Sequence, residues 1–310
     1  MKKSLTLSFI LIISYLLVDR LTYGLLKQVD KRVFTGQITG KVNQFLTLKD
    51  SVNTLVFGSS RANHHIDVSI FDSTAYNMGV DGTKLAYAAA LVETLKKKGQ
   101  NILVHVDQLR MFNNKDEYTG KDCLSLINLA EDYEEIYSVI YELYPEELRI
   151  LWFSKSYMYN GKALGFLKNY WKPSYDYQKY NGYDPLIPTG EQEKIFAGLM
   201  ENKGPDRMGY DSTLELNPVV EKMILRIQKK CEENNNMLIF FTSPTLNHIN
   251  PDLQEATTQF FKEKGILYLD YTHLFEEFNP KLWKDFTHMS AFGAETFTRR
   301  LKHDVLTHNK

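Results

Sequence analysis

Short apolar runs alternate with longer amphipathic stretches along most of the chain after residue 54. Five runs end at turn-forming or polar residues, as buried parallel strands do, at 54–58, 74–79, 101–106, 237–242 and 266–270. The stretches between them repeat apolar residues three and four positions apart and predict helices at 84–98, 217–234, 251–264 and 291–302. This alternation predicts an α/β fold, a three-layer sandwich in which helices cover both faces of a central parallel sheet.

The alternation stops between residues 109 and 214. This segment predicts two helices, at 124–144 and 146–168, followed by a stretch rich in Tyr, Pro and Gly that runs from Trp171 to Pro188. We interpret it as a helical insertion in a single domain spanning 54–310. Its expected place is over the carboxyl edge of the sheet, where the ligand crevices of α/β proteins lie.

The first 27 residues have the pattern of a membrane anchor. Lys2 and Lys3 precede an uncharged run over 4–18, and a second apolar stretch extends to Leu26. A helix over 4–26 would be about 35 Å long, against the ~30 Å core of a bilayer. No small-x-small cleavage site follows Val18, so an uncleaved signal anchor is favoured over a cleaved signal peptide.

The segment after the anchor, residues 28–53, is polar and mixed and predicts a membrane-proximal linker or helix. Basic residues lie on both sides of the apolar run, so the charge bias that orients membrane helices is weak. We expect the domain to lie outside the cytoplasm, mainly because a leading anchor usually exports the chain on its carboxyl side.

Charge and cysteine content narrow the function further. The 37 basic and 38 acidic side chains give no basic excess of the kind that nucleic-acid binding needs. Cys123 and Cys231 belong to no CxxC motif and have no histidine at zinc-ligand spacing, so no metal site is expected. Whether the two cysteines pair or remain buried thiols stays open.

Two distant motifs carry candidate chemistry. The first predicted strand ends in Gly58-Ser59-Ser60-Arg61, which places a serine hydroxyl on a tight turn at the crevice. Near the other end, Asp285 precedes His288 by three residues, a spacing that lets the carboxylate accept from one ring nitrogen while the other takes a proton from a serine. Taken alone, Asp285 could equally be a helix cap.

Together these motifs resemble the SGNH (GDSL-like) hydrolase superfamily, which implies a flavodoxin-like sandwich. In that resemblance Ser60 matches the nucleophile, Ser59 the residue before it, and Asp285 and His288 the acid and the base. Residues 77–83, Asn-Met-Gly-Val-Asp-Gly-Thr, resemble the block whose glycine donates an N–H to the oxyanion. Gly82 is the better match and Gly79 the alternative.

One family feature is missing. The third block normally ends in Gly-x-Asn-Asp, whose Asn completes the oxyanion hole, whereas this chain has Val-His-Val-Asp-Gln over 104–108. The resemblance leaves two backbone donors, Ser60 and Gly82. Losing one side-chain donor costs about 10²–10³ in rate. Gln108 could replace that donor, or Asp107 could shape the pocket.

Other polar residues near the predicted edge of the sheet could either belong to the site or have another role. Arg61 could bind a carboxylate or phosphate, or pair with a neighbouring acid. His248 follows the fourth strand and could contact substrate, and Asn77 lies in the second block. His64 and His65 are either a solvated turn or include one residue of the site.

The resemblance is strongest to anchored SGNH-like proteins of cell-envelope acylation, such as those of teichoic acid D-alanylation and alginate O-acetylation. It implies acyl transfer from a donor to a glycan or glycolipid, alongside a membrane-bound O-acyltransferase and without a cofactor. An extracytoplasmic esterase or deacetylase with the same triad, and a non-catalytic scaffold, are the alternatives.

Overall fold

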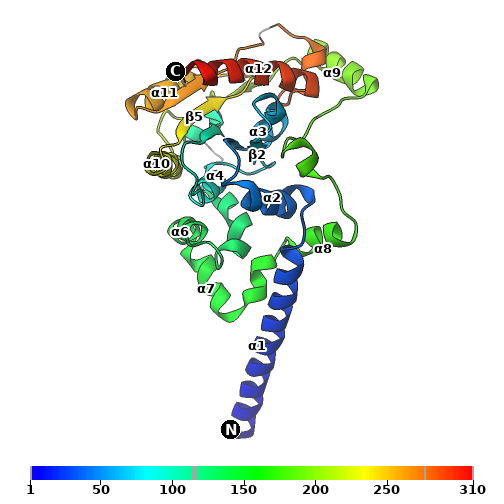
Figure 1. The fold of residues 1–310 in the computed structure, drawn as a ribbon, viewed down its shortest axis with the longest axis vertical. Coiled ribbons are helices and arrows are strands. Elements are labelled where there is room, and N and C mark those ends of the chain that lie inside the picture. Colours follow the sequence, from blue (N-terminus) through cyan, green and yellow to red (C-terminus); the bar gives the residue numbers. More distant parts are fainter. Residues whose placement is uncertain (1, 114–116, 276, 309–310) are drawn as a thin grey trace.

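A computed structural model describes residues 2–113, 117–275 and 277–308. The chain begins with one long helix and continues into an α/β domain (Figure 1). The strands of the domain are β1 (Thr54–Phe57), β2 (Ala75–Asn77), β3 (Asn101–His105), β4 (Arg207–Met208), β5 (Met237–Thr242), β6 (His248–Ile249) and β7 (Leu267–Asp270). The α-helices are α1 (Lys2–Asp30), α2 (Lys41–Leu48), α3 (Ser60–His65), α4 (Leu85–Val92), α5 (Gln108–Met111), α6 (Glu134–Leu143), α7 (Pro145–Phe153), α8 (Ala163–Trp171), α9 (Gly190–Asn202), α10 (Pro218–Glu233), α11 (Pro251–Glu263) and α12 (Ala291–His308).

Five parallel strands form the central sheet, in the order β2-β1-β3-β5-β7. The predicted α/β class, parallel sheet and apolar N-terminal helix are therefore confirmed. Strand order reverses between β1 and β3, and crevices for ligands form at such a point, beyond the carboxyl ends of the strands. β4 and β6 pair separately as a short two-stranded sheet.

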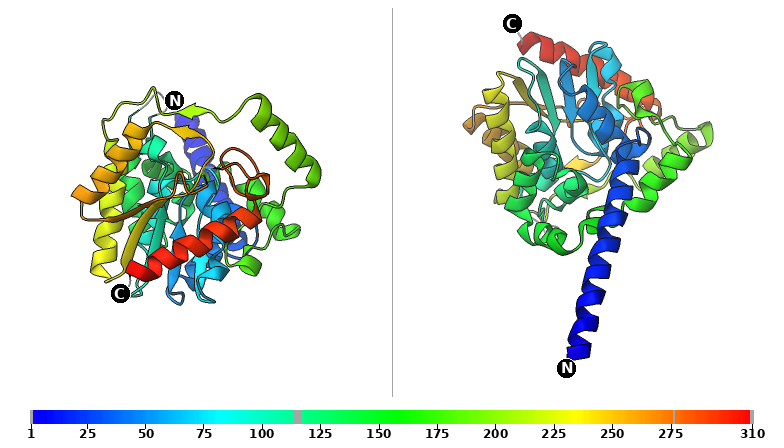
Figure 2. Two further views of the ribbon diagram at one scale, coloured as in Figure 1. Left: turned by 90° about the horizontal axis from the view of Figure 1, so that it is seen from above. Right: turned by 60° about the horizontal axis from the view of Figure 1, so that its bottom comes forward.

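Alternate residues of each strand face opposite layers of helices. Leu55 and Phe57 belong to a core shared with α2, α4, α10 and α11, whereas Val56 belongs to a core shared with α3 and α12. Both faces of the sheet are therefore covered, which explains why the strands are apolar throughout rather than alternating. Figure 2 shows the sheet between these two layers.

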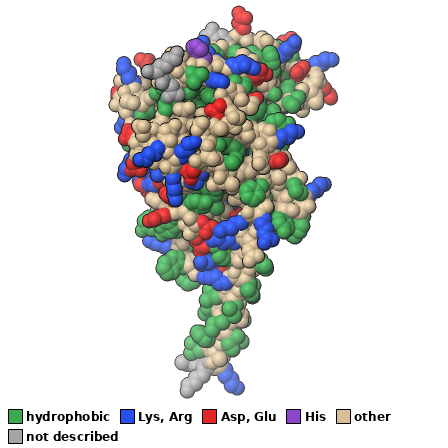
Figure 3. Space-filling model, viewed as in Figure 1, with side chains coloured by type: hydrophobic (Ala, Val, Ile, Leu, Met, Phe, Trp, Pro, Cys, Tyr) green, Lys and Arg blue, Asp and Glu red, His purple; other side chains and the backbone are tan. Residues whose placement is uncertain are grey.

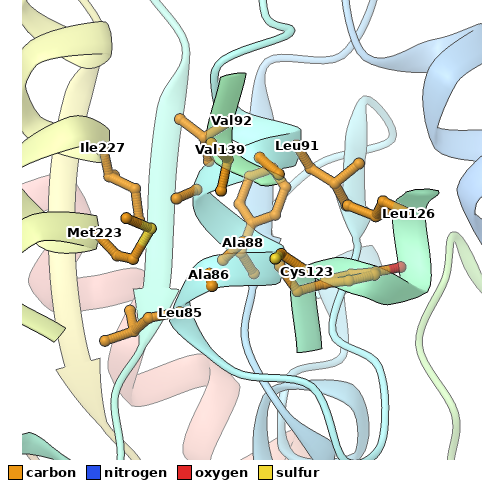
Figure 4. Packing of buried hydrophobic residues seen from close by; sticks show 14 of the residues in the cluster. Leu85, Ala86, Ala88, Leu91, Val92, Cys123, Leu126, Val139, Met223 and Ile227 are labelled. Carbon is orange, nitrogen blue, oxygen red and sulfur yellow. The ribbon is translucent and has the colours of Figure 1, made fainter. Parts of the chain in front are cut away.

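The insertion packs against the first of these cores. Cys123 and Leu126 of the 3₁₀ segment Lys121–Leu129, called η3, contact the α4 layer together with Val139 of α6 (Figure 4). Pro145 begins α7, where its fixed backbone angle suits the first turn and separates α6 from α7. In place of the two helices expected over 124–144 and 146–168, the chain thus forms η3, α6, α7, α8 and a second 3₁₀ segment, η4 (Lys155–Tyr159). Cys123 and Cys231 are both free and buried.

Residues 28–53 are largely helical, the second of the two alternatives expected for this segment. The end of α1, a π-helical turn (Gly36–Gly40) and α2 occupy this segment, and Phe45 is fully buried in the sheet's core. The segment is consequently part of the domain. Lys41, which begins α2, is buried beside the candidate site described below.

The N-terminal helix α1 has two parts with different surroundings. Its first part exposes large apolar side chains from Leu5 to Val18, and the helix is long and apolar enough to cross a membrane. Its second part packs on the domain, where Asp19 is buried and Tyr23 contacts Tyr159. Figure 1 shows the first part projecting away from the domain.

Candidate active site

The nucleophile candidate lies on a turn that only glycine allows. Gly58 follows β1 with φ +142°, and an added Cβ would stand 2.7 Å from the Cβ of His105 and 2.9 Å from that of Ala62. The chain can therefore turn sharply into α3, whose first residue is Ser60. Ser60 is partly exposed at the carboxyl end of the sheet.

The acid and base candidates share one tight loop before α12. Oδ1 of Asp285 accepts from the backbone N–H groups of Thr287 and His288, both at 2.8 Å. Farther out, Trp283 and Met289 form an antiparallel bridge that closes the loop. Because the carboxylate is held by two backbone donors, its position relative to the imidazole is fixed by the loop itself.

The three side chains form one continuous chain of hydrogen bonds. Nδ1 of His288 lies 3.0 Å from Oδ2 of Asp285, and its Nε2 lies 2.9 Å from Oγ of Ser60. With the ring proton on Nδ1 and donated to Asp285, Nε2 is free to accept the hydroxyl proton of Ser60. The two sequence motifs, 228 residues apart at Ser60 and His288, thus meet in one site.

Electrostatics favours an ionised carboxylate in this arrangement. Burial alone would raise the pKa of Asp285, but the hydrogen bond and charge of His288 hold that pKa below its usual value. The side chains of His288 and Asp285 are 27% and 49% exposed, so water reaches the triad.

His65 connects α3, the helix that begins with Ser60, to the loop before α12. Its side chain is fully buried, and its Nε2 accepts from the backbone N–H of Met289 at 3.1 Å. Its carbonyl accepts from the hydroxyl of Thr298 on α12. Burial and the nearby charge of Arg61 lower the pKa of His65 well below its ordinary value, so the ring is neutral and can accept.

The loop also has support from its other side. The side-chain amide of Asn247 donates to the hydroxyl of Thr287 at 3.3 Å, and the backbone N–H of Leu246 donates to the carbonyl of Phe286 at 3.0 Å. The segment after β5 therefore fixes the middle of the loop. Neither His65 nor Asn247 carried a sequence signal for this role.

His64 is buried next to the triad rather than solvated. Its ring lies edge-on to that of His288, with 5.7 Å between centroids. Nδ1 of His64 lies 2.7 Å from the carbonyl oxygen of Asp184, and Nε2 lies 3.2 Å from Oδ1 of Asp81. Burial lowers the pKa of His64, but the hydrogen bond to Asp81 outweighs it and raises the pKa above the ordinary value. The raised pKa favours the protonated form of His64, in which it is the cation of an ion pair with Asp81.

Lys41 lies beneath this ion pair. Its Nζ donates to Oδ1 of Asn63 at 2.7 Å and to the carbonyl of Gly79, and stands 4.8 Å from the centre of the Tyr177 ring. Burial lowers the pKa of Lys41 to about 7. Asn63 in turn donates to Asp81 at 2.9 Å. A polar network therefore connects α2, α3 and the second block.

The two glycines of the second block have different surroundings. The N–H of Gly79 donates to Oδ1 of Asn77 at 2.8 Å, and an added Cβ would stand 2.5 Å from the backbone nitrogen of Asn63. Gly79 is therefore occupied in packing the block against α3. Gly82 has φ +77° in an open turn directly after Asp81, which holds His64 beside the triad. Gly82 remains the candidate donor, because the N–H of Gly79 already donates to Asn77.

Gln108 is not available as a replacement for the missing Asn. It is buried, and its Nε2 donates to the hydroxyl of Tyr268 at 2.9 Å and to Oδ2 of Asp270 at 2.7 Å. These bonds direct the amide toward β7 rather than toward Ser60. The hypothesis of a side-chain oxyanion donor at this position is therefore not supported.

The contacts of Arg61 match neither role suggested by the sequence, binding of a carboxylate or phosphate or pairing with a neighbouring acid. Its buried guanidinium donates to the hydroxyl and carbonyl of Ser243 and, at 3.4 Å, to the carbonyl of Pro244. Asp107 and Asp270 act on it only through their charges, and burial lowers its pKa. Arg61 links α3 to the end of β5 and so helps to position the residue before it.

The remaining pocket candidates lie in three different surroundings. Asn77 is fully buried and donates to the carbonyls of Ala62 and Ile66, a structural role at the end of α3. His248 is exposed on β6, outside the triad's hydrogen bonds. Ser59 and Asp107 line a common cavity of about 20 Å³ beside the nucleophile turn, with room for about one water molecule.

Comparison with known proteins gives no family assignment. No protein-family model matches the chain, and no curated protein matches it at significant similarity.

Proposed function

We propose that this chain is a membrane-anchored serine acyltransferase of the SGNH type that works through an acyl-enzyme on Ser60. The observation that supports this is the hydrogen-bonded chain from Asp285 through His288 to Ser60. The strand order is also that of flavodoxin-like sandwiches. A serine whose hydroxyl meets an oriented imidazole is an activated nucleophile.

The reaction proceeds in two steps. Nε2 of His288 takes the hydroxyl proton as Oγ of Ser60 attacks an ester or thioester carbonyl, and Asp285 stabilises the imidazolium. The N–H groups of Ser60 and Gly82 bind the oxyanion. Collapse expels the alcohol or thiol, which takes the proton from His288. An acceptor hydroxyl then attacks the acyl group as its proton passes to His288, and His288 returns that proton to Oγ of Ser60 when the acyl bond to Ser60 breaks.

Carboxyl-ester hydrolysis is a second candidate. The exposure of His288 and Asp285 lets water reach the acyl-enzyme. Water in place of a sugar hydroxyl would make the same protein an esterase or deacetylase. The acceptor alone separates the two activities, since both share the covalent intermediate.

The setting of the proposed activity is the cell envelope. We place α1 across the membrane and the domain on the extracytoplasmic side, with a glycan or glycolipid as acceptor. A membrane-bound O-acyltransferase would supply the acyl group. No metal ion or organic cofactor takes part in the steps above.

A fluorophosphonate probe, which reacts with activated serines, tests the triad. We expect the purified full-length protein in detergent to be labelled, and the Ser60→Ala and His288→Ala variants to lose the label. Ser59→Ala is the matched control and should keep it. A folded wild-type protein without label would favour the non-catalytic scaffold.

An activated acetyl ester then distinguishes transfer from hydrolysis. The protein is incubated with the ester, with and without an oligosaccharide, and both acetate release and acetylated sugar are measured. Sugar acetylation that depends on Ser60 supports the transferase. Acetate release unchanged by the sugar supports the esterase.

A further inference from the structure

Three large apolar side chains are exposed where the insertion meets α1. Trp152 is 81% exposed, Phe153 75% and Leu164 85%. Trp152 and Phe153 end α7, and Leu164 belongs to the first turn of α8. We call these three residues the apolar corner. Exposed side chains of this size mark surfaces that contact a membrane or another protein.

The apolar corner lies at a defined level along α1. The carbonyl of Trp152 accepts from Nη2 of Arg20 at 3.0 Å, and Leu164 lines a groove together with Thr22 and Leu26. The corner is therefore beside residues 20–26 of the helix. Both α7 and α8 flank the upper part of α1 in Figure 1.

The length of the apolar run places this same level at the bilayer boundary. The uncharged run over 4–18 gives a helix of about 22 Å, some 8 Å short of a ~30 Å hydrocarbon core. About five more residues are needed, which moves the boundary to about residue 23. Leu21 and Leu25 are exposed there and can contact lipid.

The carboxylate of Asp19, which lies at this level, is satisfied by hydrogen bonds within the protein, as a charge at a membrane boundary must be. Asp19 is 4% exposed, and its carboxylate accepts from the backbone N–H groups of Lys155 and Ser156 at 2.8 and 3.1 Å. The hydroxyls of Ser154 and Ser156 and the guanidinium of Arg20 complete its partners. A carboxylate with five donors does not depend on water.

Charged side chains gather one to two turns farther along α1. Lys27 pairs with Asp132 at 2.9 Å, and Lys155 pairs with Glu131 at 2.6 Å. Figure 3 shows these charge types clustered where the apolar helix joins the domain. Along α1 the apolar part of the helix comes first, the apolar corner second and these ion pairs third. Hydrocarbon, interface and water follow each other in the same order on one side of a bilayer.

We propose that the apolar corner enters the interface of the bilayer that α1 crosses, on the side of the domain. The domain then touches the membrane at two places, the helix and the corner, and cannot swing freely about α1. Tryptophan is enriched at this depth, and interfacial segments bury their apolar face about 5–10 Å deep. The inference rests on α1 crossing a bilayer and not on the proposed catalysis.

Tryptophan fluorescence tests the depth of the corner. The full-length protein is reconstituted in phosphatidylcholine vesicles whose acyl chains carry bromine near the headgroup, which quenches nearby tryptophan. The Trp171→Phe variant retains Trp152 and the buried Trp283; a variant with Trp152→Phe in addition retains only Trp283. We expect the emission due to Trp152, the difference between the two, to be largely lost in brominated vesicles.

An equally designed control reports on the opposite end of the molecule. Phe292 is 57% exposed on α12, and Figure 1 shows α12 at the end of the molecule opposite the N-terminus of α1. Phe292→Trp in the variant without Trp152 and Trp171 should show no quenching. Equal quenching of this reporter would mean non-specific contact and would overturn the proposal.

Two further outcomes would also overturn it. Unquenched Trp152 in protein that stays with the vesicles through an alkaline carbonate wash would show a corner in water, available to a protein partner instead. Protein released by that wash would show that α1 does not cross the bilayer. Fluorophosphonate labelling in detergent is independent of both outcomes, so failure here leaves the proposed catalysis standing.

Discussion

At the scale of single residues, the site is held by charges and hydrogen bonds outside the triad. His64 pairs with Asp81 and lies 5.7 Å from the ring of His288. This ion pair connects the second block to α3. The hydrogen bond from His64 holds the pKa of Asp81 well below its usual range. His64 thereby stabilises the folded state only while it carries a proton.

This pairing predicts a pH-dependent difference in stability. The folded-state pKa of His64 is raised, so its contribution is complete below the unfolded-state pKa of about 6.5 and disappears as the pH rises through the folded-state value. We expect the wild type to exceed His64→Gln in free energy of unfolding at pH 5.5, and this margin to shrink by pH 9. Urea denaturation across that range measures it. A margin independent of pH would contradict the ion pair.

Sequence and structure agree best on residues whose role depends on a local motif. Ser60 ends a strand and His288 follows Asp285 by three residues, and both patterns can be read within a few positions. The roles of His65 and Lys41 could not be predicted, because each depends on burial by an element distant in sequence. The sequence shows that Arg61 and Gln108 can form hydrogen bonds, but it does not show with which partners. Packing places the end of β5 beside Arg61 and β7 beside Gln108.

At the scale of elements, the turn between β1 and α3 decides whether the nucleophile reaches the site. Gly58 approaches His105 and Ala62 closely and has a backbone angle that other residues avoid. Because both neighbours are packed against the sheet, neither can withdraw far from an added methyl group.

Gly58→Ala should therefore destabilise the protein by about 3 kcal/mol or more, from backbone strain and overpacking together, and weaken fluorophosphonate labelling of the molecules that remain folded. Thermal denaturation and labelling yield measure the two effects.

Gly99→Ala is the matched control, with φ +73° and no atom within 4 Å of the added Cβ. It should cost about 1–2 kcal/mol from backbone strain alone and leave labelling unchanged. An equal loss of stability in both variants would mean that close packing at Gly58 contributes nothing.

Elements of the sheet were predicted more accurately than those of the insertion. Buried parallel strands leave continuous apolar runs such as the one over 101–106, and these are visible without knowledge of their neighbours. The stretch 109–214 divides into short helices and 3₁₀ segments whose ends depend on contacts with α1 and α4. For residues 28–53 the sequence could not decide between a linker and a helix of the domain, because α2 buries polar side chains, among them Lys41 and Gln44.

At the scale of the whole molecule, α1 combines an apolar part, which makes the helix long and apolar enough to cross a membrane, with a second part that belongs to the domain. Its second part contributes buried Asp19, the contact of Tyr23 with Tyr159, and the pairing of Lys27 with Asp132. The domain therefore extends into the helix to about residue 19, well before the end expected for the anchor at residue 27.

A pair of shortened chains tests this boundary. A chain beginning at Asp19 should retain the stability of the domain, whereas one beginning at Lys31 should lose about 3 kcal/mol, because several hydrogen bonds to charged groups disappear together. Chemical denaturation of both chains in the same buffer measures the difference. Equal stability would show that the second part of α1 only lies against the domain.

The meeting of β1 with the loop before α12 has a consequence for how the protein is made. The candidate nucleophile emerges from the ribosome more than two hundred residues ahead of the candidate base, so a nascent chain carries Ser60 without the histidine that would activate it. In the proposed mechanism, Ser60 becomes reactive only when residues 285–308 dock on α3. An incomplete chain would therefore leave esters around it untouched.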